Sequence, residues 1–132
     1  MKGKRVLVTG GGRGIGRAIV RKLALDGWQV AIHYGHDEAE ARRTAAEIGA
    51  SSSGVYQLDL TQGKGLPEFF KRVTGEGPLD AVVNNAGVYV PMNFLKAGDA
   101  EFEATLHRTF SVNLEAPLRL TRLAAQHFER EN

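Results

Sequence analysis

The feature that most constrains the fold is a cluster of glycines between an apolar segment and an amphipathic one. Five glycines fall within residues 10–16, directly after the β-rich run Val6–Val8. Apolar side chains then recur at positions 15, 18, 19 and 23, which is the spacing of one helix face. The segment therefore predicts a strand, a glycine turn and a helix. In that arrangement, backbone amides and the helix dipole hold a phosphate group.

The glycine spacing differs from the general dinucleotide-binding pattern G-x-G-x-x-G, which no choice of these glycines satisfies. The segment reads Thr9-Gly10-x-x-x-Gly14-Ile15-Gly16, with a cation inside the loop. A tight turn that only needs a positive φ requires fewer glycines. We therefore predict a phosphate-binding loop whose cofactor-binding residues are Gly10, Arg13, Gly14, Ile15 and Gly16.

Composition excludes several other classes of function. The chain has 132 residues, enough for a single domain over residues 1–132 with a sizeable core. Its net charge is only +2 and its basic residues are scattered, so no nucleic-acid partner is expected. It has no cysteine, which excludes disulfides and thiolate metal sites. Its four histidines, at positions 33, 36, 107 and 127, lack ligand spacing and are predicted to be surface or incidental residues, with no metal bound.

No stretch of the sequence has the length and hydropathy of a signal peptide or a membrane span. We therefore expect a soluble cytoplasmic protein with no membrane partner.

Strand and helix patterns alternate along the chain. Strands are predicted at residues 5–9, 28–33, 55–58 and 79–83, helices at 14–26, 37–48, 66–73 and 99–131, and a loop at 51–54. This alternation predicts an α/β fold, a Rossmann-type three-layer sandwich with a long C-terminal helix. Right-handed crossovers give a parallel sheet of strand order 3-2-1-4, with a ligand crevice at the carboxyl ends of the strands.

The end of the second strand bears on the choice of cofactor. In dinucleotide folds, an acid about 20 residues beyond the glycine loop binds the ribose hydroxyls of NAD. Here the strand ends His33-Tyr34-Gly35-His36, and the first acid is Asp37. Arg13 also lies within the loop, near the expected position of a 2′-phosphate. These residues favour NADP over NAD.

Four motifs in order give the chain a resemblance to the short-chain dehydrogenase/reductase family. They are Thr9-Gly10-x-x-x-Gly14-Ile15-Gly16, Asp59-Leu60, Asn84-Asn85-Ala86-Gly87 and Ser111-Val112-Asn113-Leu114, and together they extend over nearly the whole chain. The resemblance implies that the glycine loop binds the pyrophosphate and that Asp59 accepts a hydrogen bond from the adenine amino group, with Leu60 contributing its backbone. Tyr34 stands where NAD-preferring members have Asp.

The same resemblance assigns roles to the residues after the fourth strand. Asn85, Ala86 and Gly87 line the adenosine ribose, and the pair Asn84-Asn85 also braces the sheet. In the long last helix, Pro117 lacks the N–H that would bind the carbonyl of Asn113, so a kink is expected there. The resemblance implies that Asn113 holds a water in a proton relay, which makes it the candidate catalytic residue.

The family's Ser and Tyr-x-x-x-Lys are not found in these residues. Tyr34, Tyr56 and Tyr89 are each followed four positions later by a residue other than lysine. Three hypotheses stay open. In the first, the chain is a dinucleotide-binding domain without family chemistry. In the second, it is an NADPH-dependent carbonyl reductase or alcohol oxidoreductase with a replaced proton donor, for which Tyr89 and Lys96 are the nearest candidates. In the third, it is a non-enzymatic interaction module that self-assembles or is completed by another chain.

Association is expected under each of the three hypotheses. The fourth strand forms an edge with unpaired backbone groups, and the long helix carries an apolar face. We therefore predict a homo-oligomer, a dimer or a tetramer.

Overall fold

A computed structural model describes residues 3–131, so Met1, Lys2 and Asn132 of the predicted domain lie outside the described residues. Its centre is a parallel sheet in the order β3-β2-β1-β4. The strands are β1 (Arg5–Val8), β2 (Gln29–Tyr34), β3 (Ser52–Gln57) and β4 (Ala81–Val83). The predicted strand order 3-2-1-4 is confirmed.

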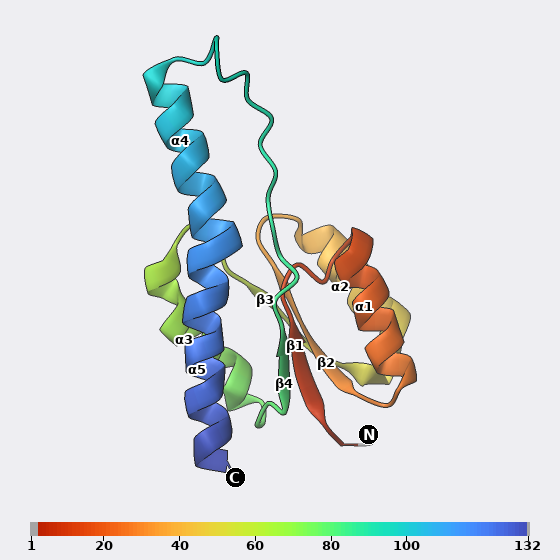
Figure 1. The fold of residues 1–132 in the computed structure, drawn as a ribbon. Helices are drawn as coiled ribbons and strands as arrows, with labels where there is room; N and C mark the ends of the chain where they lie inside the picture. The colour runs from red at the N-terminus through yellow and green to blue at the C-terminus, as the bar shows by residue number, and fades with distance from the viewer. Residues whose placement is uncertain (1–2, 132) are drawn as a thin grey trace.

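Helices cover both faces of this sheet, as the predicted three-layer sandwich requires (Figure 1). One face carries α1 (Gly14–Leu25) and α2 (Glu38–Ile48). The other carries α3 (Leu66–Gly75) and α5 (Ala116–Glu131), while α4 (Asp99–Phe110) extends beyond the sheet. Short 3₁₀ turns, η1 (Gly49–Ser51) and η2 (Gly63–Gly65), precede β3 and α3.

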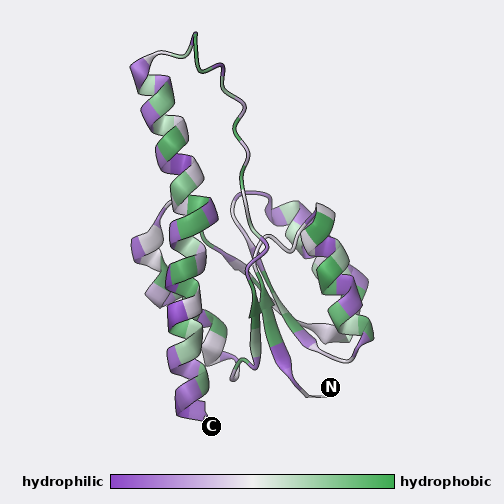
Figure 2. Cartoon of the chain, in the orientation of Figure 1, coloured by the Kyte–Doolittle hydropathy of each residue, from purple (hydrophilic) through white to green (hydrophobic). Residues whose placement is uncertain are grey.

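The alternation of side chains along β1 and β2 divides the core in two. Val6, Val8 and Ile32 pack with residues of α1 and α2, whereas Leu7 and Ala31 pack with α3 and α5. Because both faces of a parallel sheet are covered, these central strands are apolar throughout. Figure 2 shows the hydrophobic colour along the central strands and alternating hydrophobic and hydrophilic bands along the helices.

The predicted loop at residues 51–54 is wrong. Strand β3 begins at Ser52, and its pairing with β2 shifts register between Val30 and Ile32. Gly54 has a φ of +119°, which only glycine adopts readily, and it lies within this irregular stretch. A serine- and glycine-rich segment is therefore part of the sheet because β3 is an edge strand, where the packing demands on side chains are small.

The long C-terminal helix has the predicted extent but not the predicted form. Helices α4 and α5 join through a π-helical turn, η3 (Ser111–Glu115), and form one column (Figure 1). The amide of Ala116 donates to the carbonyl of Ser111, five residues back. The irregularity therefore begins ahead of Pro117, at the residues that include Asn113, because an inserted π turn rearranges the backbone hydrogen bonds before the proline.

Candidate functional site

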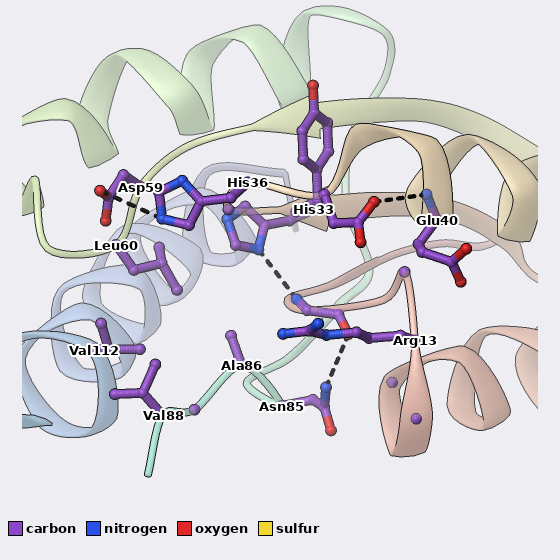
Figure 3. Close-up of a pocket in the computed structure, with 18 of the residues that line it drawn as sticks. Arg13, His33, His36, Glu40, Asp59, Leu60, Asn85, Ala86, Val88 and Val112 are labelled. Atoms are coloured by element: carbon purple, nitrogen blue, oxygen red, sulfur yellow. Dashed lines mark hydrogen bonds and ion pairs between the residues drawn. The ribbon is translucent and has the colours of Figure 1, made fainter. Parts of the chain in front are cut away.

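A pocket of about 970 Å³ lies at the carboxyl ends of the strands. The segments that follow β1, β2, β3 and β4 all contribute to its wall (Figure 3). The structure brings together in it every residue predicted to bind a cofactor, from four separate segments of the chain: Gly10, Arg13, Gly14, Ile15, Gly16, Tyr34, Asp59, Leu60, Asn85, Ala86 and Gly87. The predicted crevice is therefore present, and the candidate catalytic residue Asn113 is not among its lining residues.

The glycine loop ends in a helix N-terminus without a cap. Arg13 occupies the N-cap position of α1, its side chain makes no capping hydrogen bond, and the first turn contains no acid. The first amides of a helix have no acceptor within the helix. In α1 these amides belong to pocket-lining residues such as Gly14 and Ile15. The pocket therefore has a donor-rich, electropositive end.

Backbone conformation and close packing each explain some of the glycines of the loop. Gly10 and Gly14 have φ values of +64° and +54°. A Cβ on Gly16 would lie 1.9 Å from the carbonyl oxygen of Gly10, so α1 begins in direct contact with the preceding turn. Beside Gly14, by contrast, a Cβ would meet nothing within 4 Å, because that residue opens onto the pocket.

A clamp between Thr9 and Asn85 holds the loop against the end of β4. The hydroxyl oxygen of Thr9 accepts hydrogen bonds from the amides of Asn85 and Ala86, each at 3.0 Å. The side-chain amide of Asn85 donates to the carbonyls of Thr9, at 3.0 Å, and Gly10, at 3.3 Å. Asn84 donates to Thr121 of α5. The side chains of this Asn pair therefore brace the structure, while Ala86 and Gly87 line the pocket.

His33 is buried in the pocket wall, so the prediction that the histidines are surface or incidental residues is wrong for it. Its Nδ1 accepts from the amide of Gly10 at 3.1 Å, and its Nε2 lies 2.8 Å from the carbonyl oxygen of Leu58. The ring also packs edge-on against Phe69. Burial lowers the pKa of His33, although the hydrogen bond to Leu58 partly opposes that effect.

His127 is the second buried histidine, and it lies away from the pocket. Its Nε2 accepts a hydrogen bond from the amide of Leu79, ahead of β4, at 3.0 Å. The prediction was therefore wrong for two of the four histidines, because each ring fills a core position and satisfies a backbone amide.

The two carboxylate oxygens of Asp59 have different partners: Oδ1 contacts Thr61 in the turn that follows, and Oδ2 faces His36. Oδ1 accepts from the amide and the hydroxyl of Thr61, at 2.9 and 2.8 Å. Oδ2 lies 3.6 Å from Nε2 of His36 (Figure 3). The two hydrogen bonds from Thr61 are the largest causes of a lowered pKa for Asp59, with smaller contributions from His36 and Arg108. The carboxylate is therefore held in its charged, accepting form.

Both residues predicted to select the cofactor, Arg13 and Tyr34, line the pocket. Arg13 is exposed, and its guanidinium forms no hydrogen bond or ion pair with another residue in the range 3–131. Tyr34 ends β2, and its pKa is raised by desolvation and by the nearby Glu38. Glu40 is already paired with Arg17 and Arg43. Arg13 is therefore a pocket-lining cation without an ion-pair partner within residues 3–131, and Arg108 is another.

Asn113 acts on the backbone of the segment that follows β4. Its Oδ1 accepts from the amide of Val88 and its Nδ2 donates to the carbonyl of the same residue, both at 2.8 Å. Tyr89 and Lys96 do not join the pocket: both are exposed, and Tyr89 retains 87% of its accessible surface. The structure therefore separates the proposed replacement pair from the site.

Sequence reasoning missed several lining residues, among them His33, Thr61, Val88, Arg108 and Val112. A signal existed for His33, because the penultimate residue of a central parallel strand is buried on either face. Arg108 had none, since it reaches the pocket from α4 through the packing of a helix distant in sequence.

No helix within residues 3–131 combines the length and the apolar character needed to cross a membrane.

Comparison with known proteins gives a consistent result. The family model described as short chain dehydrogenase matches residues 4–132. General stress protein 39 of Bacillus subtilis is 35% identical over 98% of this chain and 45% of its own length. A short chain dehydrogenase from Burkholderia cenocepacia, solved with NADP, is 35% identical with a TM-score of 0.84, covering 96% of this chain and 51% of that one.

A 3-ketoacyl-(acyl-carrier-protein) reductase from Brucella melitensis, solved with NADH, is 30% identical with a TM-score of 0.82, covering 98% of this chain and 52% of that one. The chain spans about half the length of the curated relatives it matches.

Proposed function

Because the chain belongs to the short chain dehydrogenase family, we propose that its pocket binds the adenosine and diphosphate part of a nicotinamide dinucleotide. The observation that carries the proposal is the uncapped N-terminus of α1, whose first-turn residues line the pocket. An anionic diphosphate is the ligand that such a helix end prefers. The solved relatives with NADP and NADH bind dinucleotides of this class.

The residues of the pocket fit that ligand. The space beside Gly14 is open toward the pocket, whereas a Cβ on Gly16 would collide with the loop. In the proposed complex, the amides of α1 hold the diphosphate and the Oδ2 atom of Asp59 accepts from the adenine amino group. Ala86 and Gly87 contact the adenosine ribose.

We propose NADP as the preferred dinucleotide. Arg13 lines the pocket without an ion-pair partner within residues 3–131, and Tyr34 stands at the position of the acid that would bind the ribose hydroxyls of NAD. A guanidinium forms charge-assisted hydrogen bonds with a phosphate. The 2′-phosphate of NADP therefore gives Arg13 a partner that NAD lacks.

For chemistry, the proposal is reduction of a small carbonyl compound, or the reverse oxidation of an alcohol. The bound dinucleotide supplies or accepts a hydride. Asn113 contributes by fixing the backbone of Val88, a lining residue of the pocket. The alternative is a non-catalytic nucleotide-binding module, favoured by the exposure of Tyr89 and Lys96, the candidate proton donors, outside the pocket lining. Assays of NADPH oxidation with a panel of carbonyl compounds distinguish the reductase from the non-catalytic module. A reductase is expected to oxidise NADPH, and Asn113→Ala is expected to abolish or slow that reaction.

Calorimetric titration with NADP⁺ and NAD⁺ at matched salt tests the binding proposal. We expect saturable binding with NADP⁺ favoured by about tenfold, the value of one charge-assisted contact. Arg13→Ala removes this preference. The matched control is Arg21→Ala, which deletes a guanidinium on the same helix that pairs with Glu47 away from the pocket. Absence of binding to either dinucleotide contradicts the proposal.

We further propose that copies of this chain associate as a dimer or tetramer. Five apolar side chains at four-residue intervals are exposed along α4, η3 and α5: Phe102, Leu106, Phe110, Leu114 and Leu118, with exposed fractions from 37% to 64%. Such a stripe favours helix packing between copies. Light scattering at micromolar concentration is expected to give twice or four times the monomer mass, and Leu118→Glu to lower it. A monomer contradicts the proposal.

A further inference from the structure

The first two amides of the glycine loop are both held by one residue of β2. Gly10 donates to Nδ1 of the His33 ring at 3.1 Å, and Gly11 donates to the main-chain carbonyl of His33 at 3.0 Å. Nε2 of the same ring faces the carbonyl oxygen of Leu58 at 2.8 Å. Since a carbonyl only accepts, Nε2 carries the proton and Nδ1 is a lone-pair acceptor. The ring is therefore neutral and joins the loop to the segment after β3.

We propose that His33 is a positioning residue for the glycine loop and that it makes dinucleotide affinity depend on pH. This inference rests on the proposed nucleotide-binding function. A second proton on the ring would sit on Nδ1 and face the Gly10 N–H, so that two donors would oppose each other. The hydrogen bond would then be lost, and the turn that presents the α1 amides would lose its support.

The surroundings of the ring favour its neutral form. It is 2% exposed, and its ring packs edge-on against Phe69 of α3 at a centroid distance of 5.4 Å. None of the charged groups on the segments around the ring within residues 3–131 is a hydrogen-bond partner of the ring. Those groups are Arg13 of the loop, His36, Asp37, Glu38 and Glu40 after β2, Asp59 after β3, Glu68, Lys71 and Arg72 on α3, and Arg108 on α4.

The direction of the pH effect follows from burial. Desolvation lowers the pKa of His33, so the ring takes up a proton only below the ordinary histidine range. Above that range the bridge is intact and affinity is full. As the pH falls through the lowered pKa, the protonated fraction rises and affinity falls with it.

Titration with NADP⁺ from about pH 8 down to the lowest pH at which both chains stay folded, on the wild-type chain and on His33→Asn, tests the proposal. The Asn amide oxygen takes the place of Nδ1 as acceptor and does not titrate. The phosphates of the ligand titrate equally in both experiments, so the ratio of the two affinities isolates His33. We expect a ratio within about threefold at pH 8 and about tenfold in favour of His33→Asn once the pH lies below the pKa of the wild-type ring.

A matched control and a measurement without ligand complete the test. His127 is the other buried histidine that accepts a backbone amide, and His127→Asn is expected to keep the wild-type pH profile. In the wild-type chain, nitrogen NMR should show the Gly10 amide shifting as Nδ1 of His33 gains its proton. This second readout does not depend on any variant being folded.

Three outcomes would overturn the proposal. A constant ratio of affinities across the pH range, or a Gly10 amide that does not respond to protonation of His33, removes the role of His33 and leaves nucleotide binding standing. Failure of the wild-type chain to bind NADP⁺ at any pH overturns the proposed function, and with it the coupling.

Discussion

Two helix N-termini face the same pocket and are built in opposite ways. Helix α2 has a capping residue, Asp37, whose side chain accepts from the amide of Glu40 at 3.1 Å, and two acids in its first turn. Helix α1 has Arg13 at the equivalent position, no side-chain cap and no acid. One first-turn amide of α2 therefore has a side-chain acceptor, whereas no side chain caps the first-turn amides of α1.

The difference shows that a helix end becomes an anion site through what its sequence omits. Asp or Glu in the first turn stabilises a helix but competes with an anionic ligand for the same positive dipole end. At α1 the chain has a glycine loop and a cation where α2 has carboxylates. Its stability there comes from Thr9, Asn85 and His33, which hold the loop without occupying the helix amides.

The largest expected effect comes from closing the approach of α1 to its loop. In Gly16→Ala, the added Cβ would lie 1.9 Å from the Gly10 carbonyl oxygen and 2.6 Å from Nδ2 of Asn85. Backbone must therefore move, at a cost of about 3 kcal/mol in the free energy of unfolding. We expect NADP⁺ affinity to fall by about a hundredfold or more, measured by calorimetry beside chemical denaturation.

Gly75→Ala is the matched control for that variant. Gly75 ends α3, and a Cβ there would meet nothing within 4 Å. Since alanine favours a helix over glycine by about 1 kcal/mol, this substitution should leave stability equal or higher and nucleotide affinity unchanged. Equal behaviour of Gly16→Ala and Gly75→Ala would show that the close contact of α1 with its loop has no importance for the site.

The sequence was sufficient for the fold because its signals were local and periodic. The strand–glycine–helix segment predicted β1 and α1, and Asp37 predicted the start of α2, where it does cap the helix. The order of the sheet followed from right-handed crossovers alone. Pocket residues were predictable for the same reason, since the carboxyl ends of parallel strands meet at one edge.

What sequence reasoning missed depends on contacts between distant segments. The place of His33 in a central strand indicates that its ring is buried, but its hydrogen bond with Gly10, 23 positions away in the sequence, has no local signal. Arg108 reaches the pocket only because α4 continues through η3 into α5. The start of β3 at Ser52 depends on pairing with β2 and not on the propensity of the segment.

A smaller effect should follow from giving α1 the cap that α2 has. In Arg13→Asp, the carboxylate can accept from the first-turn amides and should raise the free energy of unfolding by about 1 kcal/mol relative to Arg13→Ala. The same carboxylate repels the ligand, so NADP⁺ affinity should be about tenfold below that of Arg13→Ala. Denaturation and calorimetry on the two variants measure both effects.

The reciprocal variant, Asp37→Ala, removes the side-chain cap of α2. Asp37→Ala should lower the free energy of unfolding by about 1 kcal/mol, because the amide of Glu40 loses its acceptor. It should not weaken NADP⁺ binding, because the substitution removes a negative charge from the pocket. Opposite signs at α1 and α2 are the expected result. If capping α1 left affinity unchanged while uncapping α2 reduced it, the ligand's phosphates would have to be held by α2, and the assignment of the two helix ends would be reversed.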